Sequence, residues 1–314
     1  MLKIRFILIL VVTILSFKGY SQYMFEYGGS AGIANYLGDI GGKEKTRRDF
    51  IADMKLAKTR WAASGFVRYK FTRRLYGKAE LMYFRIAGDD KLSTNPGRNA
   101  RNLSFTNDMF DLTAQGQFVF YEATDLGSDY RFRLAFRSYI GFGVGGFYSN
   151  PKAKTLDGQN VALRPLETEG VTYKAIGLNL PATIGFHFTY RKKHRFGWEL
   201  NWRTTFTDYL DDISQGWGDP SKMTPLAAAM SNRTNELDPD LFIDSPGFLS
   251  NFGYDPVQNP YNHRGDATRN DSYLTMNFSY SYILRGKSSF YRSRYGSFFN
   301  KKKRGKMRKI RAKF

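Results

Sequence analysis

Hydrophobic and polar residues alternate with a period of two over long stretches of this chain. In "YLTMNFSYSYIL" (273–284), apolar and aromatic side chains fall on one face and small polar ones on the other. "FDLTAQGQFVF" (110–120) and "FGWELNWRTTF" (196–206) repeat the pattern, with charged residues on the polar face. Successive side chains of a β-strand point to opposite faces, so each segment predicts a strand with apolar surroundings on one side only.

Further segments show the same alternation less regularly. They are residues 24–34, 62–72, 75–86, 132–148 and 174–190. Pro181 lies inside the last of them and has no amide hydrogen to donate, so we expect a bulge or bend there. Together the segments predict eight strands of about ten residues or more, which is long enough to cross a membrane at a tilt of about 45°.

The connections between these segments alternate in length, which bears on the kind of barrel. The long ones are residues 35–61, 87–108, 149–173 and 207–272, and the others are residues 72–75, 121–131 and 190–195. Outer-membrane barrels have short periplasmic turns and long extracellular loops, whereas a soluble sandwich or a lipocalin-like barrel needs no such asymmetry. The pattern predicts an all-β fold, an eight-stranded antiparallel transmembrane β-barrel over residues 22–284, with both termini in the periplasm.

Charged residues on the polar face of the strands should point into the barrel. They are Glu26, Arg68, Lys70, Lys78, Glu80, Arg133, Arg137, Glu199 and Arg203. The interior of an eight-stranded barrel is only just filled by side chains, and charges buried there need partners. A selective channel or proton path is one use of such charges. We favour the other interpretation, an interior plugged by a network of salt bridges.

The first 21 residues have the composition of a secretory signal peptide. Lys3 and Arg5 precede an apolar run over residues 6–17, and Gly19 and Ser21 suit a small-residue cleavage site. We expect cleavage after Ser21, because the run is shorter than the roughly 20 residues of a membrane-spanning helix. The chain has no cysteine, which excludes disulfides, thiolate metal sites and a lipid-modified cysteine.

Aromatic residues are abundant, with 27 Phe and 21 Tyr in 314 residues. A soluble core of this size does not need so many. Outer-membrane barrels do, because they carry girdles of aromatic side chains at both membrane interfaces. The composition therefore favours the membrane barrel over the soluble alternatives.

The positive charge of the chain is concentrated at its C-terminal end. Of a formal net charge of +20, 13 Lys or Arg lie in residues 285–314, a segment without a single acid. Residues 285–300 mix these charges with aromatics, and residues 301–314 are almost purely basic. Such a run is typical of nucleic-acid binding, but an export signal argues against a nucleic-acid partner.

We interpret this basic periplasmic extension as a docking segment. The remaining partners are the anionic membrane surface, peptidoglycan or an acidic protein, and the interleaved aromatics favour a protein. The predicted partner-binding residues are Arg285, Lys287, Phe290, Tyr291, Arg292, Arg294, Tyr295, Phe298, Phe299, Lys301, Lys302, Lys303, Arg304, Lys306, Arg308, Lys309, Arg311 and Lys313.

The sequence offers little for catalysis. His187 should face the interior, His194 lies in a short turn and His263 lies in the longest loop. No serine and acid stand at a spacing from any of them that indicates a hydrolytic triad. We therefore predict no catalytic residue, no cofactor and no enzymatic activity.

The connection over residues 207–272 is long enough that we expect it to be functional or partly disordered. Its Asp238, Asp240 and Asp244 could gather a hard cation, but the twelve-residue calcium-loop pattern is absent and acid-rich surface loops are common. The tripeptide "RGD" at 264–266 is too short a match to indicate integrin binding. We predict no metal site here.

Two segments resemble a known family. "EYGGSAGIANYLGDIGG" (26–42) is a glycine-rich first strand that runs into a Tyr-Leu-Gly-Asp turn, and "RGDATRNDSYLTMNFSYSY" (264–282) leads into the last strand. Both resemble the PorG-like outer-membrane proteins of the Bacteroidota type IX secretion system. The resemblance implies a non-enzymatic barrel in contact with outer-membrane lipids and with periplasmic ring proteins of the PorK/GldK and PorN/GldN type.

These observations together predict an outer-membrane barrel that anchors or positions a secretion assembly, and possible gliding machinery, from its periplasmic face. Three other functions of the same fold stay open from the sequence. A barrel enzyme acting on lipid would need an outward-facing catalytic cluster, which changes at His187 or His263 would expose by loss of activity. A small-solute channel would have a lumen free of paired charges. An adhesin would carry its activity in residues 207–272.

Overall fold

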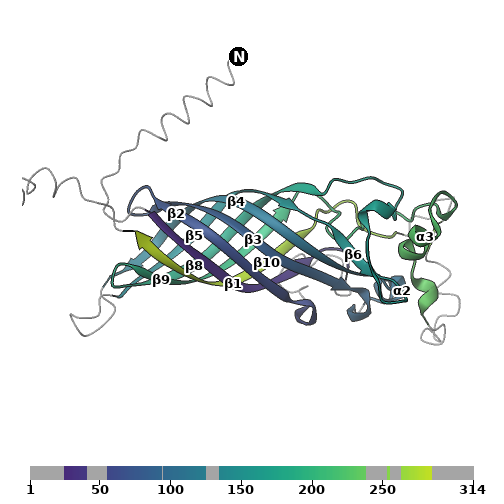
Figure 1. The fold of residues 1–314 in the computed structure, drawn as a ribbon, viewed down its shortest axis with the longest axis horizontal. Helices are drawn as coiled ribbons and strands as arrows, with labels where there is room; N and C mark the ends of the chain where they lie inside the picture. The colour runs from purple at the N-terminus through teal and green to yellow at the C-terminus, as the bar shows by residue number, and fades with distance from the viewer. Residues whose placement is uncertain are drawn as a thin grey trace, which may run out of the picture.

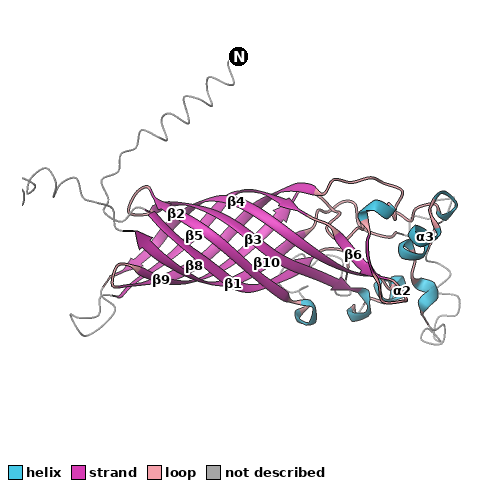
Figure 2. Cartoon of the chain, viewed as in Figure 1, coloured by secondary structure: helices cyan, strands magenta, loops and turns pink. Residues whose placement is uncertain are grey.

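The computed structural model describes residues 25–40, 55–93, 95–124, 134–237, 253–254 and 263–284. Within them, long strands form one closed antiparallel barrel (Figures 1 and 2). The strands of the barrel are β1 (Phe25–Leu37), β2 (Arg60–Lys70), β3 (Leu75–Asp89), β4 (Ser104–Ala123), β5 (Leu134–Tyr148), β8 (Ile176–Tyr190), β9 (His194–Thr205) and β10 (Ser272–Leu284). Each pairs with its two neighbours, the first strand β1 pairs with the last strand β10, and β3 pairs with β4. The predicted eight-stranded barrel is confirmed.

Every segment that alternation marked is a strand, but one is much longer than predicted. The strand predicted over residues 110–120 runs from Ser104 to Ala123. In its first part the residues still alternate inward and outward but the polarity is reversed, with Phe105 and Met109 buried on the inner face and Asp108 on the outer face. Only part of this strand therefore has the apolar outer face that alternation detects. The connection predicted over residues 87–108 is shorter in the structure, because β3 ends at Asp89 and β4 begins at Ser104.

Of the bulge or bend predicted at Pro181, the structure shows no bulge. Pairing between β5 and β8 skips two residue pairs, between Phe142–Ala182 and Gly145–Asn179, but the register on either side is the same. On its other side Pro181 stays in register with Arg203 of β9. Proline removes one donor without adding a residue, so the ladder has a gap and no shift. The register shift of the barrel lies in β4 instead, between Val119 and Tyr121.

The long connections contain short elements of their own. A hairpin of β6 (Pro151–Lys154) and β7 (Asn160–Ala162) extends the sheet beside β4. The helices are α2 (Pro96–Arg101) and α3 (Pro225–Ser231), with 3₁₀ turns η2 (Leu56–Lys58), η3 (Asp90–Leu92), η4 (Arg164–Leu166), η5 (Pro220–Lys222) and η6 (Thr234–Glu236). In the described part of the chain, no helix is long and apolar enough to cross a membrane.

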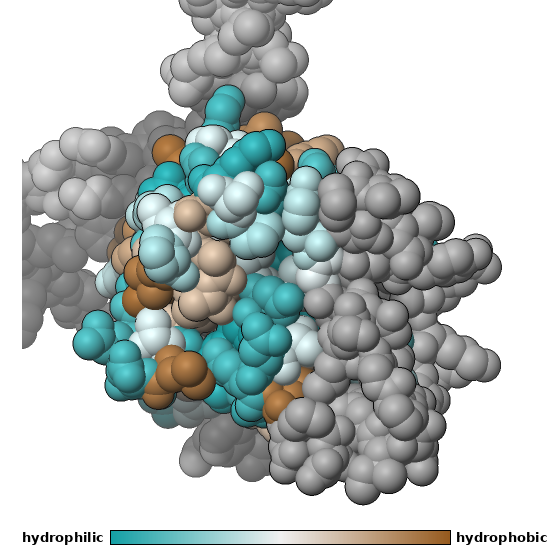
Figure 3. Space-filling model, turned by 90° about the vertical axis from the view of Figure 1, so that its right-hand side faces the viewer, coloured by the Kyte–Doolittle hydropathy of each residue, from teal (hydrophilic) through white to brown (hydrophobic). Residues whose placement is uncertain are grey.

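The two ends of the barrel differ. The connections 71–74, 124–133 and 191–193 are short and share one end, which we call the turn end. The longer connections meet at the opposite loop end, where α2, α3 and β6 lie (Figure 1), and Figure 3 looks onto this end. Phe25 of β1 pairs with Leu284 of β10, so the first and last strands begin and finish at the turn end.

The interior of the barrel changes character along its axis. The inner face of β3 reads Tyr76, Lys78 and Glu80 toward the turn end, and Met82, Phe84 and Ile86 toward the loop end, all buried. The second set joins a hydrophobic cluster with residues from the other strands and from the loops. The half of the interior near the loops is therefore packed like a soluble core, and the other half is polar.

Glycines of β1 bring that strand against β10. A Cβ atom on Gly32 would lie 2.0 Å from the carbonyl oxygen of Met276, and one on Gly28 would lie 2.2 Å from that of Tyr280. Both contacts are with backbone, which cannot move aside without breaking the ladder. The glycine-rich first strand is thus a steric requirement of the pairing between first and last strands.

Candidate functional site

A network of ion pairs fills the polar half of the interior, and Glu199 of β9 is at its centre. One carboxylate oxygen of Glu199 accepts from Arg68 at 3.0 Å and from the Tyr139 hydroxyl at 2.6 Å. The other accepts from the Lys78 ammonium. All of these side chains are almost fully buried, so each charge depends on its partners for stability.

Two further groups extend the network along the axis. Toward the turn end, Glu26 of β1 accepts from both Arg68 and Arg195. Toward the loop end, the Arg203 guanidinium lies 3.3 Å from a Glu80 oxygen and 3.1 Å from an Asp111 oxygen. The buried cations Arg68, Lys78, Arg195 and Arg203 are matched in number by the buried carboxylates Glu26, Glu80, Asp111 and Glu199.

Most of the inward charges expected from alternation take part in this network. Six of them do so: Glu26, Arg68, Lys78, Glu80, Glu199 and Arg203. Lys70 and Arg137 lie at the mouth of the turn end, and Arg133 is outside the described residues. The plugged, salt-bridged interior is confirmed.

Two members were missed by the sequence reasoning, each for its own reason. Asp111 occupies the polar face of its strand, so the alternation itself could have found it. Arg195 was assigned to a turn because the strand was expected to begin at residue 196. Since β9 begins at His194, Arg195 points inward and reaches Glu26.

The histidines lie in three different environments. His187 faces the interior as predicted, with its ring centre 5.4 Å from that of Tyr139, and neither of its nitrogens has a hydrogen-bond partner among the described residues. His194 shares a 2.9 Å hydrogen bond with the Tyr280 hydroxyl. His263 lines a cavity at the loop end. The three do not come together.

At the loop end, the two segments that carried the family resemblance meet. The amide of Asp266 donates to the Asp39 carboxylate at 2.7 Å. The hydroxyl of Tyr36 lies 2.6 Å from an oxygen of Asp271 and 2.7 Å from one of Asp211. A Cβ atom on Gly38 would lie 2.0 Å from the same Asp271 oxygen, so any larger residue here would displace the Asp271 and Tyr36 side chains.

Two buried arginines tie the loops to one another. Arg264 donates to Glu169 at 2.9 Å and to the carbonyl of Asp212 at 2.8 Å. Arg101 donates to both oxygens of Asp90 and to the carbonyl of Asp39. Arg264 is the first residue of "RGD" and is 2% exposed. Its side chain is therefore occupied inside the protein, and this tripeptide is not presented as a receptor motif.

Three carboxyl groups beneath these loops, those of Asp208, Asp211 and Asp271, are buried without forming an ion pair to a Lys or Arg of the described residues. Burial, and next the Asp39 carboxylate, raise the pKa of Asp211 to about 8. Burial, and next Asp211, raise the pKa of Asp208 to about 9, and burial also holds the pKa of Asp271 well above its usual range. Because the Tyr36 hydroxyl has a single hydrogen, its contacts with two carboxyl groups require one of those groups to be protonated.

No cation site accompanies these acids: in the described ranges, no three His, Cys, Asp or Glu side chains are placed to hold a metal ion. Asp238, Asp240 and Asp244, which were considered as ligands, lie outside the described residues. The same holds for the predicted partner-binding residues from Arg285 to Lys313. Their predicted role stays a prediction.

We expect the loop end to loosen as the pH rises. The folded-state pKa of Asp211 is about 8 against an ordinary value of 3.8, so the folded form keeps a proton that the unfolded form has lost. The stabilisation is complete below pH 3.8 and is lost as the pH rises through about 8. Hydrogen exchange of residues 207–237, corrected for intrinsic rates, should speed up between pH 6 and pH 9.

Asp211→Asn is the control for this prediction, because its side chain does not titrate. Its exchange profile should be flatter over the same pH range. Protection that is constant or that increases toward pH 9 in the unmodified protein would contradict the prediction.

Comparison with solved structures finds distant barrels. The attachment invasion locus protein Ail of Yersinia pestis, in complex with the heparin analogue sucrose octasulfate, is 10% identical with a TM-score of 0.33. A second structure of Ail is 9% identical with a TM-score of 0.30. Each match covers 83% of this chain and 99% of the Ail chain. At these values the likeness says nothing about ligands or partners.

Comparison with sequences leads to a family. No curated protein matches the chain. A family model described as a domain of unknown function, DUF6089, matches residues 4–222, which extend from before β1 through β9 to η5. The match covers well over half of the sequence, including the glycine-rich first strand and the whole of the ion-pair network. The chain therefore belongs to the DUF6089 family.

Proposed function

We propose that this protein is a non-enzymatic outer-membrane β-barrel that anchors or positions the periplasmic ring of a type IX secretion machinery. The observation that carries the proposal is a closed barrel with an apolar outside and a sealed inside. The anchoring role is supported by the resemblance to PorG-like proteins and by the basic extension that follows the last strand.

The outside of the barrel suits lipid. Large apolar side chains point outward at alternate positions on neighbouring strands and are more than half exposed, among them Leu112 at 62%, Phe142 at 65%, Leu178 at 64% and Phe278 at 66%. An apolar surface of this extent is unfavourable in water and favourable in a bilayer. The strands have 11 to 20 residues, enough for the roughly 9–11 needed to span the bilayer.

Aromatic side chains gather toward both ends of this apolar surface. Toward the turn end, the rings of Tyr27 and Tyr282 are 6.2 Å apart. Toward the loop end, Tyr83 lies 5.1 Å from Trp61 and 4.8 Å from Phe110. Such rings prefer the headgroup region, so two belts of them would set the depth of the barrel in the membrane.

The sealed interior favours a structural role over transport. A channel would need a continuous polar path, whereas here the buried charges are paired and the loop half of the interior is packed with apolar side chains. We therefore place the function at the surfaces of the barrel. The general rule for outer-membrane barrels puts short turns in the periplasm, so the turn end, and with it the extension after Leu284, would face the ring.

A pull-down from solubilised envelopes tests the anchoring role. We expect the full-length protein to recover the ring subunits, and a chain stopped after Leu284 to recover on the order of tenfold less, because 13 basic residues are lost. The barrel must still insert and shift on unheated gels. A full-length variant with the 13 basic residues changed to Gln separates charge from aromatic packing, and its residual binding should depend less on salt.

An unchanged set of ring subunits after truncation would contradict a docking role for the extension. Recovery of no ring subunit by either chain would contradict the secretion role as a whole. An adhesin, in contrast, would keep its activity without the extension and lose it on deletion of loop residues between 207 and 272.

A further inference from the structure

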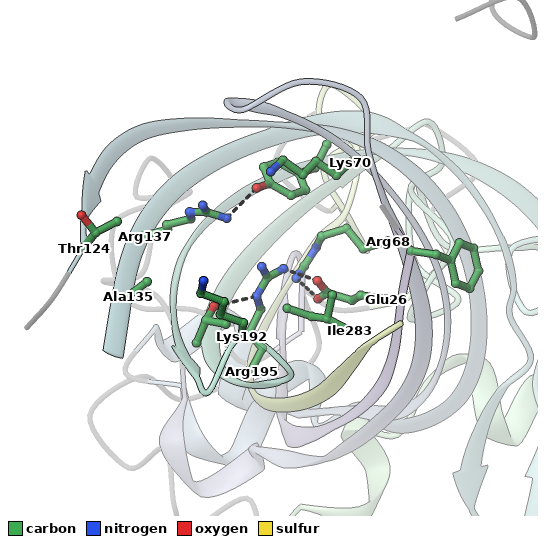
Figure 4. A pocket seen from close by; sticks show the side chains of 12 residues that line it. Glu26, Arg68, Lys70, Thr124, Ala135, Arg137, Lys192, Arg195 and Ile283 are labelled. Carbon is green, nitrogen blue, oxygen red and sulfur yellow. Dashed lines mark hydrogen bonds and ion pairs between the residues drawn. The ribbon is translucent and has the colours of Figure 1, made fainter. Parts of the chain in front are cut away.

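A cavity of about 330 Å³ opens into the barrel at the turn end (Figure 4). Its charged lining consists of one carboxylate and five cations: Glu26, Arg68, Lys70, Arg137, Lys192 and Arg195. They come from β1, β2, β5, β9 and the turn between β8 and β9. Glu26, Arg68 and Arg195 belong to the balanced network, so Lys70, Arg137 and Lys192 are the positive charges that the cavity lining adds to it.

Part of this charge is already used inside the protein. Arg68 and Arg195 both donate to Glu26. Arg137 donates twice to one oxygen of Glu122 and once to the Tyr76 hydroxyl, at 2.7 Å. These contacts fix the arginines in place, so the cavity is preorganised.

Two of the lysines, Lys70 and Lys192, form no ion pair in the described part of the chain. Lys70 is half-buried, and within that part its ammonium makes no hydrogen bond or ion pair. Lys192 stands exposed at the rim in the same situation, and Arg195 uses Nε and Nη1 while Nη2 stays unpaired there. Positive groups that converge on a cavity with low-dielectric walls create a strong local potential for anions.

We propose that this cavity is a binding site for a small oxyanion, a phosphate- or carboxylate-bearing ligand held by Lys70, Arg137 and Arg195. Charge-assisted hydrogen bonds from guanidinium and ammonium groups suit oxygens of this kind. Apolar side chains in the wall, including Ala135 and Ile283, leave room for the carbon skeleton of an organic anion. The site does not depend on what the basic extension binds.

The absence of cysteine from the chain allows a local test. Thr124 lines the cavity, so Thr124→Cys carries a single environment-sensitive fluorophore beside the site. Thr268→Cys places the same reporter at the loop end. The labelled full-length proteins are titrated in detergent with inorganic pyrophosphate and with citrate, at constant ionic strength. We expect a saturable change from the first reporter and none from the second.

Lys70→Gln should weaken the response at residue 124 by about tenfold, the loss typical of one charge-assisted hydrogen bond. It leaves the internal ion pairs in place. Lys222→Gln, an exposed change near the loop end, is the matched control and should bind as before. The basic extension is present in every variant, so any anion binding by the extension contributes equally to all of the measurements that are compared.

Each result of these titrations either supports or contradicts the proposed anion site. A response to pyrophosphate alone or to citrate alone supports the site and names the anionic group. Equal changes at both reporters, a response that does not saturate, or unchanged binding in Lys70→Gln with the barrel still folded would overturn it.

Discussion

Replacing Glu199 by Gln is expected to lower the free energy of unfolding by about 3–5 kcal/mol, the usual cost of removing one partner from a buried ion pair. Glu199 accepts hydrogen bonds from Arg68, Lys78 and Tyr139. Without its charge, the buried cations of the network outnumber the carboxylates. Lys78 is 2% exposed and cannot reach water without opening the barrel.

Urea unfolding in phospholipid vesicles, followed by the fluorescence of the four tryptophans, measures this effect. Glu122→Gln is the matched control. It removes a carboxylate paired with Arg137, but at the partly exposed mouth of the turn end, where such pairs contribute about 1 kcal/mol or less.

A double variant tests whether the lost balance of buried charge is the cause of the destabilisation. Lys78→Met combined with Glu199→Gln restores the balance of charge, so the pair of changes should cost less than the two single costs added together. A loss of under about 1 kcal/mol for Glu199→Gln alone would mean that water or rearrangement satisfies these cations, and the plugged interior would not be a source of stability.

Replacing Arg264 by Met should open the loops while the membrane-facing barrel stays folded. Arg264 is buried and bonded to Glu169 and to the carbonyl of Asp212. Its loss leaves the Glu169 carboxylate without its cationic partner and the Asp212 carbonyl without this donor. We expect local opening at the loop end to become easier by about 3 kcal/mol, on the order of a hundredfold in the equilibrium.

Limited proteolysis and hydrogen exchange of residues 207–237 report this opening, and the heat-induced shift on gels reports the barrel. Arg85→Gln is the control, since the Arg85–Asp108 pair is substantially exposed and its loss should change little. Unaltered protection in Arg264→Met would contradict the role of Arg264 as the tie between the loops. Loss of the gel shift would show that loops and barrel unfold as one unit.

The sequence by itself determined the barrel strands and the side of each residue. Alternation is a property of neighbouring residues in an extended chain, so it survives without any knowledge of the partners. It placed Glu26, Arg68 and Glu199 inward and the large apolar residues outward. It failed near strand ends such as Ser104 and His194, where the outer face is no longer apolar and the pattern no longer separates strand from loop.

Tertiary structure alone decided which inward charges meet. Glu26 reaches Arg195 across 169 positions of the chain, and Tyr36 reaches Asp271 across 235. These meetings depend on the registers of strand pairs that close the barrel, and a register is a relation between distant segments. Likewise, only the assembled barrel separated the balanced network from the positive mouth at Lys70, since burial and pairing of a charge are set by everything that surrounds it.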